Sequence, residues 1–233
     1  MLTLKKSFVG VVLFGAVCSV QAAPVTLTGS NFSVTYDDAL LGLFGTPSLS
    51  GNTLFFTPTN FQALSENGAG IDLVKQTANF DFFLAPDSNT RFDTVKLSEA
   101  GDYLQFGGES FADVRGQIRV RDVANPAQEN VSFISPSAPL DIADGSNHDW
   151  SANTSTDLSG TEWKDTRAVR VTLENILLAY SQAGTGPQLS FVEKKFAGIN
   201  VAVAPIPEPS TWLMMLGGMG VLGFIAVRRR DQF

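Results

Sequence analysis

Hydrophobic and polar residues alternate along most of this chain. The clearest runs are Ile118–Arg121 and Val169–Leu173, in which every second residue is isoleucine, valine or leucine. Side chains of a strand point to opposite faces in turn, so this period is typical of an antiparallel sheet with one buried face. The same alternation, less regular, recurs in Val25–Tyr36, Ile71–Leu84, Ile176–Tyr180, Leu189–Phe191 and Ile199–Val203.

Residues that favour tight turns lie between these runs. Examples are Ser50–Asn52, Asn67–Gly68, Pro86–Asn89 and Gly184–Pro187. No long stretch has the period of an amphipathic helix, although Ala39–Phe44 has room for one or two helical turns. We therefore predict a mostly β domain over residues 23–205, an antiparallel β-sandwich of roughly nine or ten strands, with the jelly-roll among the arrangements that this number allows.

The N-terminal segment does not alternate. Lys5-Lys6 precedes the apolar run Phe8–Val20, and Val20–Ala22 places small residues where a signal peptidase cuts. We predict that residues 1–22 are a signal peptide cleaved after Ala22. A first transmembrane helix is disfavoured because the run is short. Acylation of Cys18 as in a lipoprotein is disfavoured because the residue before it is a bulky valine.

The C-terminal segment is also apolar. Thr211–Val227 is a run of 17 residues, at the lower limit of what crosses a bilayer as a helix. Three basic residues follow it: Arg228, Arg229 and Arg230. Because positive flanks resist translocation, they orient this end toward the cytoplasm and place the domain on the far side of the membrane.

A short motif precedes this predicted transmembrane helix. Pro207, Glu208 and Pro209 forbid regular helix and favour an extended segment just outside the membrane. With the helix and the arginine cluster, residues 206–233 resemble the sorting signal of the PEP-CTERM proteins of Gram-negative bacteria. The resemblance implies export, recognition by an exosortase, cleavage near the Pro-Glu-Pro motif, and a place at the cell surface, often with exopolysaccharide. A C-terminal anchor that is never cut is the alternative.

The charge of the domain limits its partners. Setting aside the charged residues of the two terminal segments leaves 11 basic and 21 acidic residues, a net charge of about −10. Such acidity argues against nucleic acid and anionic membrane surfaces as partners and is compatible with divalent cations. After cleavage at Ala22 the chain has no cysteine, so the stability of the exported domain has to come from its core.

One polar segment, Ser135–Thr161, is predicted to be a long surface loop or a site. Carboxylate and amide oxygens, which calcium prefers, gather around its Gly145. The candidate calcium ligands are Asp141, Asp144, Asn147 and Asp149. The spacing is not that of an EF-hand, and a solvated acidic loop without a metal is the alternative.

Signatures of catalysis are sparse. His148 is the single histidine, no Gly-x-Ser-x-Gly motif supplies a nucleophilic serine, and one histidine is too few for the usual catalytic zinc site. Paired carboxylates would suffice for glycoside hydrolysis, but the sequence singles out no pair. Trp150 and Trp163 flank the polar segment as sugar-binding platforms or as core residues.

Two functions remain. The first is a non-enzymatic structural or adhesive protein of the cell surface or exopolysaccharide matrix. The second is a secreted hydrolase, or a carbohydrate-binding module, that acts on polysaccharide. The sequence favours the first, because the second requires a site that leaves no trace in the sequence.

Overall fold

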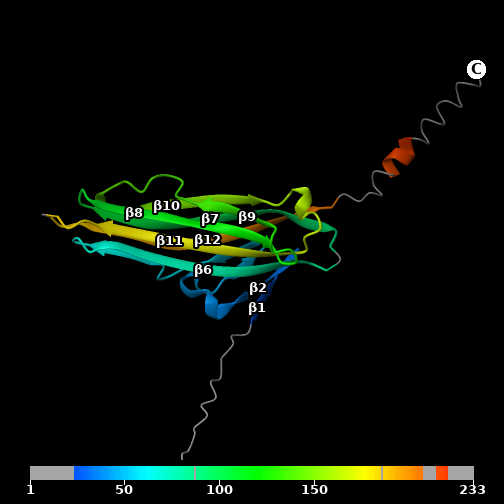
Figure 1. The fold of residues 1–233 in the computed structure, drawn as a ribbon, viewed down its shortest axis with the longest axis horizontal. Helices are drawn as coiled ribbons and strands as arrows, with labels where there is room; N and C mark the ends of the chain where they lie inside the picture. Colours follow the sequence, from blue (N-terminus) through cyan, green and yellow to red (C-terminus); the bar gives the residue numbers. More distant parts are fainter. Residues whose placement is uncertain (1–23, 87, 185, 207–213, 220–233) are drawn as a thin grey trace, which may run out of the picture.

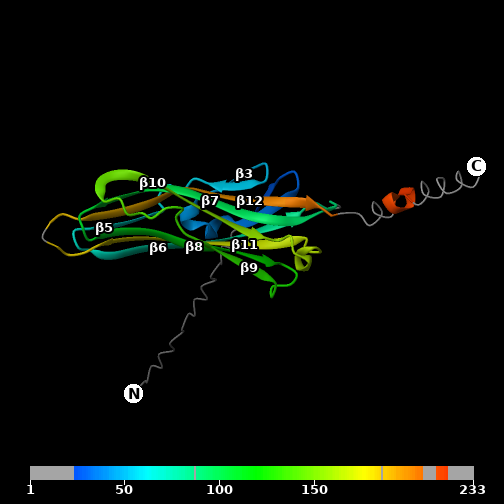
Figure 2. The same cartoon turned by 90° about the horizontal axis from the view of Figure 1, so that it is seen from above.

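Strands make up most of the molecule. The computed structural model describes residues 24–86, 88–184, 186–206 and 214–219. In these ranges twelve strands pair in two antiparallel sheets (Figure 1). The first sheet has the order β1-β2-β6-β11-β8-β9 and the second the order β10-β7-β12-β4-β3, with β5 also paired to β12. The two sheets lie face to face (Figure 2), so the β-sandwich predicted from the alternation is confirmed.

The central strands are unusually long. The first sheet consists of β1 (Pro24–Thr28), β2 (Phe32–Asp37), β6 (Gly70–Leu84), β11 (Ala168–Ser181), β8 (Ser110–Asp122) and β9 (Glu129–Ile134). The second consists of β10 (Asp144–Asp157), β7 (Thr90–Phe106), β12 (Leu189–Pro205), β4 (Thr53–Phe56), β3 (Ser48–Ser50) and β5 (Gln62–Glu66). Short 3₁₀ turns at Asp38–Leu40 and Gly42–Phe44 occur where the sequence allowed helical turns, and a third lies at Thr161–Trp163.

The core lies between the sheets and is built from the apolar half of each alternating run. On β11, for example, the buried residues are Val169, Val171, Leu173, Leu177 and Ala179. Aromatic rings fill the space near the β2 and β4 end, where Phe44, Phe56, Phe61 and Phe80 contact one another edge to face or tilted. In the middle of the β11 row lies the buried Asn175, and the matching rows on β7 and β12 contain the buried Glu99 and Lys194.

The two faces of β6 allow a matched test of the core. Phe80 is fully buried, whereas Phe83 points outward and is 38% exposed. We expect Phe80→Ala to lower the free energy of unfolding by about 3–5 kcal/mol, because it removes a large apolar side chain and leaves a cavity. Phe83→Ala should cost less than about 1 kcal/mol. Denaturant unfolding of both variants checks the difference, and equal losses would contradict this assignment of faces.

The structure contradicts the prediction that Ser135–Thr161 is a long surface loop. Most of it is strand β10, at the edge of the second sheet and paired with β7. The alternation of hydrophobic and polar residues did not predict β10, because its inward side chains include His148, Thr154 and Thr156, which are not apolar. Only Trp150 and Ala152 give the inner face its expected hydrophobic character.

Both predicted terminal signals fall outside the described residues, wholly or in large part. The signal peptide, residues 1–22, lies outside them, as do the Pro-Glu-Pro motif and Arg228–Arg230. Of the predicted transmembrane helix, residues 214–219 are described, and they are helical. Within the described ranges, no helix has the length and apolar character needed to cross a membrane.

Candidate functional site

The four candidate calcium ligands lie at the start of β10 or just before it. Asp144 is the first residue of the strand, and its Oδ1 lies 2.9 Å from Nε2 of His148. Asn147 donates a hydrogen bond from Nδ2 to Oδ2 of Asp102 on β7, and Asp149 pairs with Asp102 across the sheet. Among the described residues, no three His, Cys, Asp or Glu side chains form a group that could hold a metal ion. Calcium binding stays a prediction.

The pKa of Asp144 is lowered from its ordinary value. The main causes are the hydrogen bond from His148 and then the one that the backbone N–H of Ser146 donates to Oδ1 at 2.8 Å. We expect His148→Ala to raise the pKa of Asp144 toward its ordinary value, as followed by carboxyl NMR. The stabilising contribution of charged Asp144 is present above its unfolded pKa and is lost as the pH falls through the lowered folded value.

Asp157 is the internal control for this titration. Its pKa is lowered by the backbone N–H of Ser159 and not by a histidine. It should titrate identically in the unsubstituted protein and in His148→Ala. A variant in which Asp144 keeps its low pKa would show that the histidine is not the cause.

Three carboxylates lie in a row on the outer face of the second sheet. The strand register places Asp149 of β10, Asp102 of β7 and Glu193 of β12 side by side. Lys195 Nζ lies 2.6 Å from Asp102 Oδ2 and 3.8 Å from Glu193, and these contacts raise the pKa of Lys195. The side chain of Asp102 is only 5% exposed. The acid at the centre of the row is therefore both neutralised and covered, which is unfavourable for a hydrolytic pair.

A cavity of about 240 Å³ lies between β10 and the segment that precedes it. Its lining includes Tyr103, Leu140, Ile142, His148 and Trp150. The rings of Tyr103 and His148 are tilted with centroids 5.6 Å apart. Trp150 is buried, and its Nε1 donates to the backbone carbonyl of Glu193 at 3.0 Å. Trp163 is buried as well, so both tryptophans are core residues and not exposed sugar platforms.

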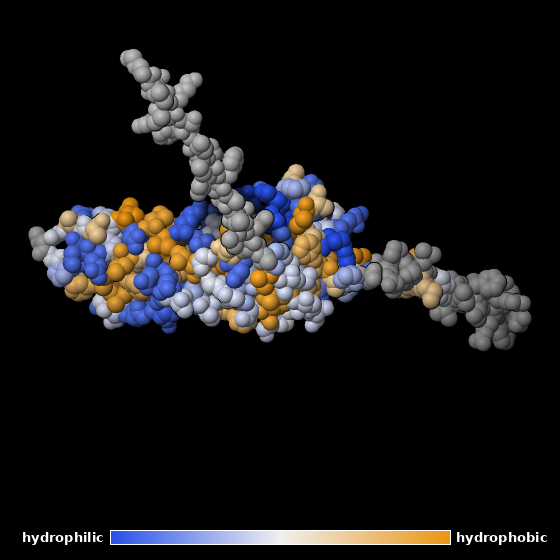
Figure 3. Space-filling view, turned by 90° about the horizontal axis from the view of Figure 1, so that it is seen from below, coloured by the Kyte–Doolittle hydropathy of each residue, from blue (hydrophilic) through white to orange (hydrophobic). Residues whose placement is uncertain are grey.

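Apolar side chains are exposed on the outer face of the first sheet. Tyr180 of β11 lies between Ile71 of β6 and Phe111 of β8, and in the next outward row Leu178 lies beside Leu73. We call these five residues the apolar strip. Ile71, Leu73 and Phe111 are each about half exposed or more. Figure 3 shows hydrophobic residues exposed among hydrophilic ones along the edge on which β1, β2 and β6 lie. Contiguous apolar surface of this kind marks interaction sites.

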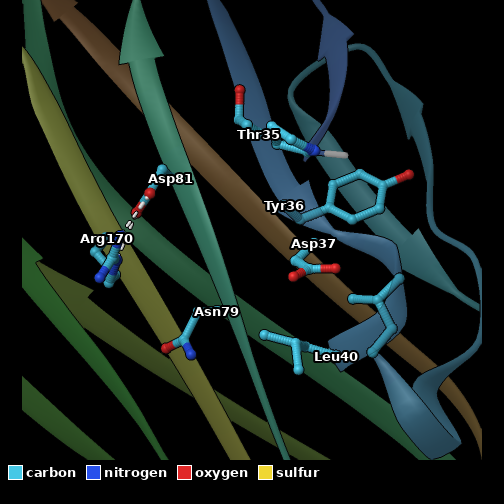
Figure 4. Close-up of a pocket in the computed structure, with 9 residues that line it drawn as sticks. Thr35, Tyr36, Asp37, Leu40, Asn79, Asp81 and Arg170 are labelled. Atoms are coloured by element: carbon cyan, nitrogen blue, oxygen red, sulfur yellow. Dashed lines mark hydrogen bonds and ion pairs between the residues drawn. The ribbon is translucent and has the colours of Figure 1, made fainter. Parts of the chain in front are cut away.

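A second hollow, of about 280 Å³, lies where β2 meets β6 and β11 (Figure 4). Asp37 and Leu40 line it from the β2 side, and Asn79 from β6. Arg170 also lines it, but its guanidinium is held by Asp81 through two hydrogen bonds of 2.7 and 2.8 Å. This pairing raises the pKa of Arg170 and engages its Nε–H and Nη2–H donors, so among the described lining residues no unpaired cation faces an anionic ligand.

The described part of the sandwich runs to Ile206. β12 stops at Pro205, and the N–H of Ile206 donates to the carbonyl oxygen of Asn89 at 3.0 Å. The side-chain Nδ2 of Asn89 donates to the carbonyl oxygen of Ile206 at 3.2 Å. These two bonds fix the last described residue before the Pro-Glu-Pro motif. The end of β12, orange in Figure 1, lies at one pole of the sandwich.

The C-terminal stretch that follows the sandwich matches a known sorting motif. Residues 205–230 match the PEP-CTERM protein-sorting motif. The match begins at the last residue of β12, so the PEP-CTERM segment follows the folded domain without a spacer. It implies processing by an exosortase, export and association with the cell surface.

Other comparisons say little about the domain itself. No curated protein matches the chain. Among solved structures, one of infectious bursal disease virus, Gx strain, is similar at 12% identity and a TM-score of 0.30, over 82% of this chain and 48% of the viral one. The chain thus spans about half of that protein. A cyclase from Fischerella sp. TAU, in complex with 4-(1H-indol-3-yl)butan-2-one, is similar at 12% identity and a TM-score of 0.21, over 81% and 83% of the two chains. Likenesses at these scores carry no argument about function.

Proposed function

We propose that this protein is a non-catalytic structural or adhesive module of the cell surface or exopolysaccharide matrix. In this account the signal peptide, residues 1–22, directs it across the inner membrane. The helix 211–227 and Arg228–Arg230 then hold it there with the domain outside. An exosortase cuts near Pro207–Pro209, and the domain is released to the cell surface or matrix.

The position of the PEP-CTERM motif is the observation that carries the proposal. Because Ile206, whose N–H is bonded to Asn89, is the last described residue before the motif, a cut at the motif separates an intact sandwich from its anchor. A protease groove accepts an extended segment, and the two prolines favour that conformation.

The surface of the domain supports a binding role over a hydrolytic one. The carboxylate row is neutralised by Lys195 at its centre, whereas Ile71, Leu73 and Phe111 of the apolar strip are exposed in the part of the chain that the structure describes. Aromatic and aliphatic side chains such as Tyr180 and Phe111 suit the C–H faces of sugar rings. Hydrolysis of polysaccharide at Asp149 and Glu193 is the second candidate, because the strand register does bring these acids close to Asp102.

Sedimentation with exopolysaccharide isolated from the host tests both candidates. We expect the protein to pellet with the polymer and to release no reducing ends. Phe111→Ser should weaken retention about five-fold, the effect of losing about 1 kcal/mol of contact. Phe106→Ser is the matched control, because Phe106 is equally exposed but lies on the opposite sheet.

Two results would overturn this account. Release of reducing ends that is lost in Asp149→Asn or Glu193→Gln would establish the hydrolase. Equal retention of Phe111→Ser and the unsubstituted protein would exclude the apolar strip as the binding surface.

A further inference from the structure

Three polar residues meet in the middle of the hydrophobic core. Glu99 of β7 and Lys194 of β12 belong to the second sheet, and Asn175 of β11 belongs to the first. The side chains of Glu99 and Lys194 are fully buried, and Asn175 has no exposed surface. Burying an amine, a carboxylate and an amide together is costly, so their presence in the core calls for a function.

The three side chains converge on a single oxygen. Lys194 Nζ lies 2.5 Å from Oε2 of Glu99, and Asn175 Nδ2 donates to the same Oε2 at 3.1 Å. Oε1 of Glu99 and Oδ1 of Asn175 are buried without a hydrogen-bond partner. The amine and the amide nitrogen thus both contact one carboxylate oxygen, and the cluster is incompletely satisfied as it stands.

The neighbours of the Glu99, Asn175 and Lys194 side chains are aromatic rings and a glycine. The rings of Trp150 and Phe61 lie 5.1 and 6.0 Å from Lys194 Nζ. Opposite Asn175 on β8 is Gly116, where a Cβ atom would lie 3.1 Å from Nδ2. Burial lowers the pKa of Lys194, an effect that Glu99 partly opposes. A desolvated lysine with a lowered pKa is a nucleophile in its neutral form.

We propose that Lys194 and Asn175 form an intramolecular isopeptide bond, with Glu99 as the catalytic proton carrier. Glu99 Oε2 takes a proton from Lys194, and the neutral Nζ attacks Cγ of Asn175. The Nζ–Cγ bond forms and the Cγ–Nδ2 bond breaks. Glu99 returns the proton to Nδ2, which leaves as ammonia, and takes up the second proton from Nζ, so that a secondary amide is left beside a neutral Glu99 carboxyl. One amine and one primary amide become one secondary amide and ammonia, so the step needs no oxidant, cofactor or second substrate.

The product is a covalent staple between the two sheets, because β11 and β12 lie on opposite sides of the core. It removes the buried charges of the ion pair. It also gives a domain without cysteine a cross-link that does not depend on redox conditions. This inference is independent of the proposed binding function, since the bond forms within the folded chain.

The mass of the full chain tests the proposal. The purified protein should be lighter than its sequence requires by about 17 Da, the mass of one ammonia molecule. Trypsin normally cuts after Lys194, which would release residues 171–194. An acylated Lys194 is not cut, so the map should instead contain residues 171–195 with the same mass deficit and an internal Lys194–Asn175 link.

Two variants distinguish the isopeptide from other losses of ammonia. Cyclisation at Asn67-Gly68, for example, would also remove about 17 Da. Lys194→Met and Glu99→Gln should each have the full mass, whereas an unrelated cyclisation would persist in both. The proposal is overturned if the unsubstituted protein releases residues 171–194 at full mass, or if the deficit remains in Lys194→Met. The peptide map of the unsubstituted protein decides the matter even where a variant does not fold.

Discussion

Glu99→Ala is expected to be among the most destabilising single substitutions in the domain. It removes the partner of the buried Lys194, which costs about 3–5 kcal/mol when the other charge is left uncompensated. It also removes the proton carrier, so the staple does not form. A covalent bond that closes the loop between Asn175 and Lys194 contributes about 3 kcal/mol to stability. Because whole domains are stable by about 5–15 kcal/mol, most of the folded population should be lost on mild heating or in low denaturant.

A double variant separates the two contributions. Glu99→Leu with Lys194→Met removes both charges and fills the space with apolar side chains, so it should recover the electrostatic loss but not the staple. Its unfolding midpoint should therefore lie between those of Glu99→Ala and the unsubstituted protein. A double variant as stable as the unsubstituted protein would show that no cross-link contributes to stability.

Alanine at Pro207, Glu208 and Pro209 is expected to abolish C-terminal processing. Alanine removes both the extended backbone and the carboxylate that the exosortase would recognise, so the full-length chain should accumulate in the membrane fraction. Immunoblotting of fractions with an antibody against the domain measures this. Alanine at Asp231 and Gln232, just beyond the matched residues 205–230, is the control and should leave processing intact. Normal cleavage of the triple variant would show that the motif is not the recognition element.

The sequence was a good guide where strands have one apolar face. Val169–Leu173 and Ile118–Arg121 are strand in the structure because their alternation leaves a continuous apolar inner row. β10 was missed because an edge strand tolerates polar residues on both faces, and His148 and Thr154 occupy inward positions. Tight turns were easier to locate, because glycine, proline and asparagine occur there for local steric reasons.

The polar clusters could not be predicted in the same way. Glu99, Asn175 and Lys194 are 76 and 19 residues apart along the chain, and only the strand register and the stacking of the sheets bring them together. A lysine within an alternating run looks like an outward residue, although Lys194 follows Ser190 and Val192 in the inward phase of β12. The carboxylate row around Asp102 could not be predicted either, because its neighbours Asp149 and Glu193 come from other strands.

The intact mass of the protein from its native host, compared with a strain that lacks the exosortase, tests the central claim most directly. We predict a chain without residues 1–22 and without everything after about Pro209, and only where the protease is present. In the deletion strain the C-terminal segment should be retained. A mature chain that keeps Arg228–Phe233 in both strains would make this segment a permanent anchor and would contradict the account of a sorted and released surface protein.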